Sequence, residues 1–125
     1  MDEDIKKRLA CDPDGLATYE FMANNIDSID PMLSELVDNM IKVDANGQFT
    51  VSAARYLNAI NAEKYNGEIQ RLISAAIDKD RERVYIGSLL ADIWGSDYAD
   101  NADSLSATDN NFRRIYKRLF PASII

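Results

Sequence analysis

The sequence predicts an all-α fold: a compact, single-domain multi-helix bundle over residues 1–125, with one short β-hairpin near residues 41–51. Two observations predict the helices. Apolar residues recur at helical spacing through most of the chain, and proline or glycine turns stand between the periodic segments. A third observation bounds the core, because 125 residues of which 46% are hydrophobic can bury one core without metals or disulfides.

The first third of the chain predicts three helices. Residues 2–10 predict a short helix, which the turn at residues 12–15 ends. Residues 16–26 follow helical spacing. Asp30-Pro31 is typical of an N-cap followed by proline in the first helical position. The apolar residues behind it repeat at i, i+3, i+4, i+7 and i+8, as Leu33, Leu36, Val37, Met40 and Ile41.

The remaining two thirds predict further helices. We expect a shorter helix over residues 52–60 and another five-point apolar pattern after Asn66-Gly67. That second pattern consists of Ile69, Leu72, Ile73, Ala76 and Ile77. Residues 86–94 predict a helix that Gly95 ends, whereas residues 97–105 are acidic and only weakly periodic. We expect no internal repeat.

The predicted hairpin surrounds the turn at residues 44–47, which has the aspartate and glycine positions of a type I turn. A two-residue Asn-Gly loop would pair Val43 with Thr50 and would mix apolar and polar side chains on each face. A three-residue loop with Gly47 in the left-handed conformation pairs Val43 with Phe49 instead. Because this register keeps apolar residues together, we predict it over the first.

Residues 109–120 separate charge from apolar surface more cleanly than any other segment. On a helical projection, one arc holds the apolar side chains and a separate arc holds the basic ones. The apolar arc consists of Phe112, Ile115, Tyr116, Leu119 and Phe120, and the basic arc of Arg113, Arg114, Lys117 and Arg118. Ser106 and Asp109 predict a capping arrangement before this helix, and Pro121 predicts its end.

Two roles are open for this basic amphipathic helix. Its apolar arc can pack on the body of the protein, since a free helix of this length is marginal in water. Alternatively, the helix can dock on a partner, such as an acidic groove of another protein or a second copy of this chain. We expect the first role. The candidate partner-contact patch then consists of the four basic residues Arg113, Arg114, Lys117 and Arg118.

The composition argues against most enzyme classes. The chain has no histidine, which excludes serine–histidine and cysteine–histidine nucleophile systems and most catalytic zinc sites. No Gly-x-x-x-x-Gly-Lys phosphate loop occurs. We therefore expect no catalytic, cofactor-binding or metal-binding residues, and a carboxylate-dependent enzyme is only the third possibility for the function.

The charge and the cysteine count bear on partners and compartment. A net charge of −7 disfavours binding to nucleic acid or to an anionic membrane, because both polyanions would be repelled. Cys11 is the only cysteine, so no disulfide can form within the chain. The longest uncharged apolar run, residues 84–91, is too short to span a bilayer. We expect a cytoplasmic protein that associates with another protein or with itself.

Two acidic patterns raise the question of a cation site. The loop at Asp44 resembles part of a calcium-binding helix-loop-helix, but Lys42 stands where the first acidic ligand belongs and Ala53 where a bidentate glutamate belongs. We interpret this loop as a structural turn. The acids at residues 97, 100 and 103 recur every three residues, and we interpret them as surface and helix-start residues rather than as a cation site.

A third pattern bears on DNA binding. Residues 49–57 resemble the opening of an excisionase-type helix-turn-helix, with residues 69–73 as its recognition helix. The connection is too long for a tight turn, and residues 50–78 carry three bases against three acids, whereas a DNA-reading helix needs surplus positive charge. We therefore predict a non-enzymatic protein-interaction or regulatory module that uses the basic C-terminal helix. The alternative is a helix-turn-helix DNA-binding regulator over residues 49–77.

Overall fold

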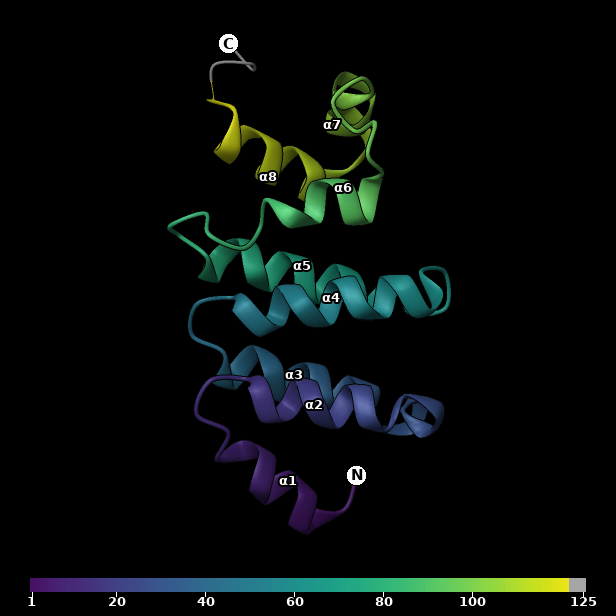
Figure 1. Ribbon diagram of the computed structural model, residues 1–125, viewed down its shortest axis with the longest axis vertical. Coiled ribbons are helices and arrows are strands. Elements are labelled where there is room, and N and C mark those ends of the chain that lie inside the picture. The colour runs from purple at the N-terminus through teal and green to yellow at the C-terminus, as the bar shows by residue number, and fades with distance from the viewer. Residues whose placement is uncertain (122–125) are drawn as a thin grey trace.

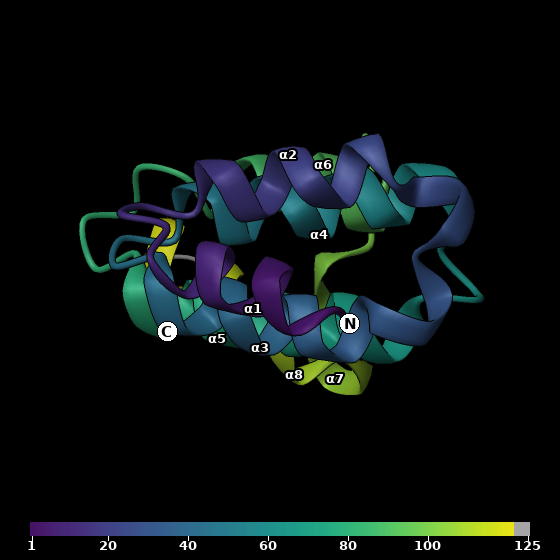
Figure 2. The ribbon, with the colours of Figure 1, turned by 90° about the horizontal axis from the view of Figure 1, so that it is seen from below.

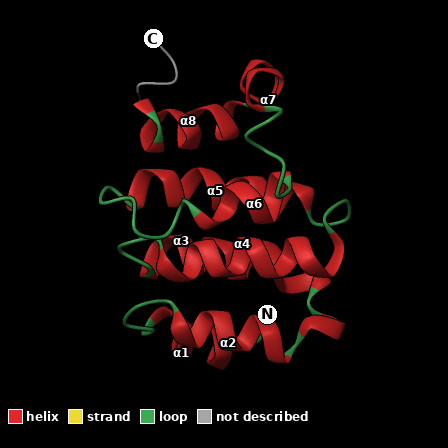
Figure 3. Ribbon diagram, turned by 45° about the horizontal axis from the view of Figure 1, so that its top comes forward, coloured by secondary structure: helices red, strands yellow, loops and turns green. Residues whose placement is uncertain are grey.

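The computed structural model describes residues 1–121, and the regular elements of that part of the chain are all helices (Figure 3). The α-helices are α1 (Glu3–Ala10), α2 (Leu16–Asn24), α3 (Leu33–Val43), α4 (Gln48–Asn61), α5 (Asn66–Lys79), α6 (Ser88–Trp94), α7 (Ala102–Thr108) and α8 (Asn110–Leu119). Two single-turn 3-10 helices, η1 (Ile26–Ser28) and η2 (Asp30–Met32), connect α2 to α3.

The helices form two layers, which Figure 2 shows edge-on, along the long axis of the molecule. Helices α2, α4 and α6 make one layer, and α1, α3, α5 and α8 make the other, with α7 packed against α8. The chain alternates between the layers, so successive helix pairs stack along the long axis of the molecule (Figure 1). In this arrangement each helix pair contacts its neighbours in the stack.

The same loop recurs at one side of this stack. Asp12, Asp44 and Asp80 lie 32 and 36 residues apart, each follows the end of a helix of the second layer, and each is buried. The chain therefore has an internal repeat, and the expectation of none was wrong. The repeat escapes notice in the sequence because the first two loops share Asp-x-(Asp/Asn)-Gly-x-x-Thr, whereas the third retains only the aspartate.

The short β-hairpin predicted near residues 41–51 is also wrong, because α3 runs to the residue before Asp44 and α4 begins directly after Gly47. The Asp44 carboxylate accepts hydrogen bonds from the amides of Asn46 (3.2 Å) and Gly47 (3.1 Å). It also accepts from the amide (2.8 Å) and the hydroxyl (2.7 Å) of Thr50. These bonds start a helix and use amides that a pair of strands would need. Gly47 does adopt the left-handed conformation, with φ at 90°.

The other predicted helices are present, with changes at their ends. The helix predicted over residues 52–60 begins earlier, at Gln48, and α7 begins inside the weakly periodic segment and runs past its end to Thr108. Ser106 lies inside α7 and does not cap the last helix. Asp109 alone is the N-cap of α8, where its carboxylate accepts from the amide of Phe112 at 3.1 Å. Asp30 begins the 3-10 turn η2 rather than α3 itself.

Helix α8 packs its apolar arc on the body of the protein. Phe112 and Ile115 are fully buried, and of this arc only Phe120 is strongly exposed, at 41%. The Trp94 ring of α6 meets the Phe112 ring edge-on with 5.3 Å between centroids, and its indole N–H donates to the Asp109 carboxylate at 2.8 Å. The amphipathic helix α8 thus packs on the core of its own chain, at the C-terminal end of the second layer.

Candidate functional site

The third loop holds its buried aspartate through backbone amides alone. The Asp80 carboxylate accepts from the amides of Val84 (3.0 Å), Tyr85 (2.7 Å) and Ile86 (2.8 Å). The amide of Ile86 takes the place that the Thr50 amide has in the second loop, six residues after the aspartate. This network fixes the path of the loop between α5 and α6, and it brings the intervening residues to the C-terminal end of α8 (Figure 1).

Arg83 has an unusual backbone conformation in this loop. Gly15 and Gly47 stand three residues after the first two aspartates, with φ of 104° and 90°, and Arg83 stands three residues after Asp80 with φ of 59°. Among the described residues it is the one non-glycine residue with positive φ. Left-handed backbone is strained for a residue that carries a Cβ atom. An exposed arginine therefore occupies the repeat position at which the earlier loops have glycine.

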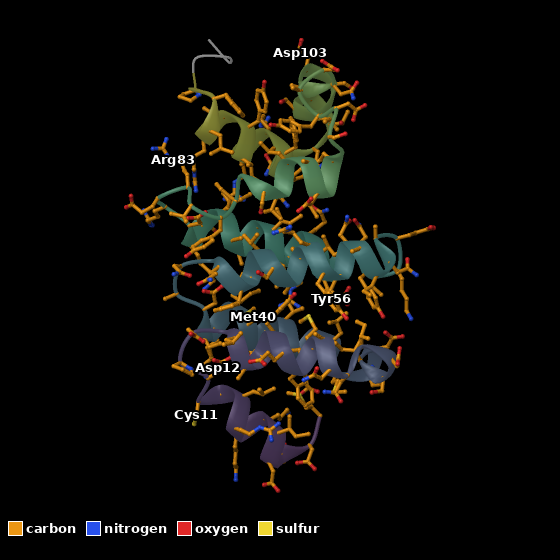
Figure 4. All side chains as sticks on the ribbon, in the orientation of Figure 1. Cys11, Asp12, Met40, Tyr56, Arg83 and Asp103 are labelled. Atoms are coloured by element: carbon orange, nitrogen blue, oxygen red, sulfur yellow. The ribbon has the colours of Figure 1, made fainter. Side chains whose placement is uncertain are left out.

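Helix α8 brings three more cations to the same place. Arg83 lines a shallow surface depression together with Arg114, Lys117, Arg118 and Pro121. The guanidinium of Arg83 also donates to the backbone carbonyl of Arg118 at 3.3 Å. Figure 4 shows Arg83 beside the loop side of the stack, next to the C-terminal end of α8. Within residues 1–121, no acidic side chain lines this depression.

The structure divides the predicted patch into anchored and free cations. Arg114 is half-buried and donates to Asp78 of α5 at 2.7 Å, and Arg118 is half-buried and donates to the carbonyl of Ile77. Lys117 is exposed and has no ion-pair partner among the described side chains. Arg113 is exposed, donates to Asn110 of its own helix, and lies outside the depression.

The hydrogen bond from Arg118 to the carbonyl of Ile77 has an equivalent in each earlier copy of the repeat. In each second-layer helix after α1, one polar side chain donates to a backbone carbonyl of the preceding second-layer helix. That carbonyl lies three residues before the buried aspartate that follows the helix. Asn39 donates to the carbonyl of Leu9 at 2.9 Å, Lys79 to that of Ile41, and Arg118 to that of Ile77. These bonds satisfy carbonyls at helix C-termini that have no partner within the helix. Arg118 thus has a structural role as well as a place in the basic depression.

Sequence reasoning missed Arg83, because it lies 26 residues before the start of the amphipathic segment, residues 109–120. The signal that finds it is the alignment of the three aspartate loops, in which arginine replaces glycine. The two ends of the chain also differ in charge. Residues 1–110 carry 10 basic and 21 acidic side chains, and residues 111–125 carry four basic and no acidic ones. The depression is therefore a local positive site on an acidic protein.

The ionisable groups with shifted pKa values lie in other parts of the stack. The Lys64 ammonium and then the Tyr65 hydroxyl bind the Asp30 carboxylate and lower its pKa. Near the N-terminus, Lys6 lowers the pKa of Glu35 by a hydrogen bond, and the terminal ammonium adds to this effect. The first ion pair joins η2 to the turn between α4 and α5, and the second joins α1 to α3. Their side chains are partly or strongly solvent-exposed. We interpret them as structural.

The remaining sequence patterns do not assemble into a further site. Across residues 1–121, no three histidine, cysteine, aspartate or glutamate side chains gather in a way that could hold a metal ion. The acids at residues 97, 100 and 103 are exposed in the turns around the start of α7. Residues 49–77 form most of the long helices α4 and α5, which pack against each other, and the apolar face of α5 is buried.

No known protein family, curated protein or solved structure matches this chain. None of the described helices combines the length and apolar character needed to cross a membrane.

Proposed function

We propose that the protein is a non-enzymatic protein-interaction module that binds an acidic protein segment through the basic face of α8. The observation that carries this proposal is the gathering of Arg114, Lys117 and Arg118 on one side of a helix whose apolar side is already buried. With that side buried, the face left for a partner is the charged one. Stacked helix pairs commonly serve as rigid binding surfaces, which fits this role.

Charge complementarity favours an acidic partner of limited size. A short acidic segment can contact the basic face without approaching the acidic remainder of the protein, whereas an extended polyanion would be repelled by that remainder. The alternative, a DNA-binding regulator over residues 49–77, has less support, because α5, which holds its recognition segment, is in contact with α3, α4 and α8. A helix-turn-helix protein must instead leave its recognition helix free to enter a groove.

The test is binding of a fluorescent glutamate-rich peptide to the full chain, measured by anisotropy at several salt concentrations. The double variant Arg113→Glu, Lys117→Glu reverses the two exposed cations and leaves Arg114 and Arg118 in their contacts with α5. We expect it to weaken binding about tenfold or more, since charge-assisted contacts are lost and repulsion replaces them.

The matched control is Lys7→Glu, Arg8→Glu, which makes the same charge change on exposed residues of α1 at the other end of the stack. This control should bind nearly as well as the unaltered chain. Equal weakening by both variants would show that only net charge matters and would contradict the proposal. Duplex DNA that shifted in a gel, while the peptide did not bind, would favour the DNA-binding alternative.

A further inference from the structure

Two separate steric demands fall on the glycines of the first two loops. One is the left-handed backbone, and the other is the close approach of the next loop. A Cβ atom on Gly15 would lie 3.2 Å from Cβ of Asp44, and one on Gly47 would lie 3.3 Å from Cβ of Asp80. The third aspartate loop is the last in the described chain, so the second demand is absent at Arg83. The first demand remains, and a glycine there would still relieve it.

A second unfavourable feature coincides with this strain. Arg83 adds a fourth positive charge to the depression that already holds Arg114, Lys117 and Arg118. Asp78 pairs with Arg114, but Arg83, Lys117 and Arg118 have no carboxylate partner among the described side chains, and like charges in one depression repel one another. Backbone strain and charge repulsion thus meet at one residue. Strained backbone conformations of this kind are concentrated at active sites and ligand-binding sites.

The donor geometry of the depression fits a compact anion. Each of the three guanidinium groups is held by one or two contacts with its own protein: Arg83 by the carbonyl of Arg118, Arg118 by that of Ile77, and Arg114 by Asp78 and Ser74. A guanidinium carries five N–H donors, so several remain on each group. The depression therefore combines fixed planar donors with the mobile ammonium of Lys117, which is a set suited to a tetrahedral oxyanion.

We propose that Arg83, Arg114, Lys117 and Arg118 form a binding site for the phosphate group of a phosphorylated protein segment. This inference rests on the proposed interaction function and names the chemistry of the partner. A phosphomonoester presents about two negative charges and three acceptor oxygens in one small group, which matches four cations in one depression better than a carboxylate does. The acidic body of the protein favours such a compact dianion over a membrane or a nucleic acid.

The experiment uses three fluorescent peptides of one sequence, which differ only in carrying phosphoserine, glutamate or serine at the central position. Their binding to the full chain is measured by anisotropy at an ionic strength of about 0.15 M. We expect the phosphopeptide to bind about tenfold more tightly than the glutamate peptide, and inorganic phosphate to displace it. Arg83→Ala should weaken phosphopeptide binding about tenfold through loss of charge-assisted hydrogen bonds.

The matched control is Arg81→Ala, which removes the same charge from an exposed residue of the same loop outside the depression, and it should change binding less than twofold. Arg83→Gly separates binding from stability. It should weaken phosphopeptide binding as Arg83→Ala does, yet raise the melting temperature by about 2–5 °C because strain and repulsion are relieved. A merely structural Arg83 would instead lower the melting temperature when replaced and would leave binding unchanged.

Several outcomes would overturn the phosphate site. If the glutamate peptide bound as tightly as the phosphopeptide, the phosphate inference would fail while the proposed acidic-partner function stood. If no peptide bound, both would fail. If Arg83→Ala and Arg81→Ala weakened phosphopeptide binding equally, the depression would not be the binding site. Binding to vesicles that contain phosphatidic acid, without binding to the phosphopeptide, would assign the site to a lipid headgroup and contradict the proposal.

Discussion

The second and third aspartate loops begin alike and end differently. In the second loop, the buried Asp44 binds three amides and the Thr50 hydroxyl, and α4 starts directly after Gly47. In the third loop, Asp80 binds three amides and no hydroxyl, and α6 starts only at Ser88. The comparison shows which parts of the loop the stack requires. The aspartate orients the chain in both loops, whereas glycine is present where the next aspartate loop lies against it.

Removal of Asp44 should have the largest effect. Asp44→Ala leaves three amides and the Thr50 hydroxyl without their acceptor in a buried site, and we expect a loss of about 3–4 kcal/mol in the free energy of unfolding. Asp80→Ala should cost less, about 2–3 kcal/mol, because the third loop has one bond fewer and faces solvent on one side. Urea unfolding followed by circular dichroism measures both.

The control for this pair is Asp97→Ala, an exposed acid whose loss should change stability by less than about 0.5 kcal/mol. If Asp80→Ala proved more destabilising than Asp44→Ala, the number of hydrogen bonds to the aspartate would not determine how much each loop contributes to stability.

The contrast between the loops also explains how far the sequence could predict the fold. The apolar patterns of α3 and α5 predict their positions well, because one buried face at helical spacing dominates each segment. The hairpin prediction failed because the type I turn signature at residues 44–47 is local. It does not reveal that the Asp44 carboxylate accepts from the amides that follow it and so starts a helix. The repeat was missed because its third copy lacks the two residues that make the first two copies similar.

The candidate site was predictable in part for a similar reason. The charge separation in the last helix identifies Arg113, Arg114, Lys117 and Arg118 without any structure. It does not reveal that Arg114 and Arg118 are anchored on α5, because that depends on which side of α8 packs there. Arg83 lies beside the cations of α8 because the helix pairs stack. The periodicity of a single segment does not predict a contact between two segments.

Replacement of Gly47 should have the next largest effect and should show the opposite sign to a glycine introduced at position 83. Gly47→Ala places a Cβ atom on left-handed backbone, 3.3 Å from Cβ of Asp80 and 3.4 Å from the carbonyl oxygen of Ala76. We expect a loss of about 2–3 kcal/mol. Thermal and urea unfolding both measure this loss, and they also give the sign of the change in Arg83→Gly.

Gly67 provides the control for that prediction. It lies in the first turn of α5, and a Cβ atom there would meet no other atom within 4 Å. Gly67→Ala should therefore stabilise the protein by about 0.5–1 kcal/mol, since alanine loses less entropy in a helix. A neutral Gly47→Ala would show that backbone conformation and packing do not require glycine in the second loop.

The smallest expected effect is a pH dependence at the first loop, which tests whether it works as the second loop does. Burial alone raises the pKa of Asp12, but hydrogen bonds from the hydroxyl and amide of Thr18 and from the amides of Gly15 and Asp14 outweigh it, so the pKa is lowered. A carboxylate with a lowered pKa in the folded state contributes stability above its unfolded value near 3.8, and loses it as the pH falls through the folded value.

The measurement is the difference in unfolding free energy between the unaltered chain and Asp12→Asn, followed by urea unfolding from neutral pH to strongly acidic pH. The difference should be constant near neutrality and should shrink below about pH 4, where the unfolded carboxyl takes up its proton. Other paired acids titrate in both proteins and cancel. The effect is smaller than the two losses above, because a protonated Asp12 keeps its size and part of its accepting capacity, whereas an alanine keeps neither. A difference that persisted unchanged to the lowest pH would mean that the charge on the loop aspartate is unimportant and that shape alone holds the repeat together.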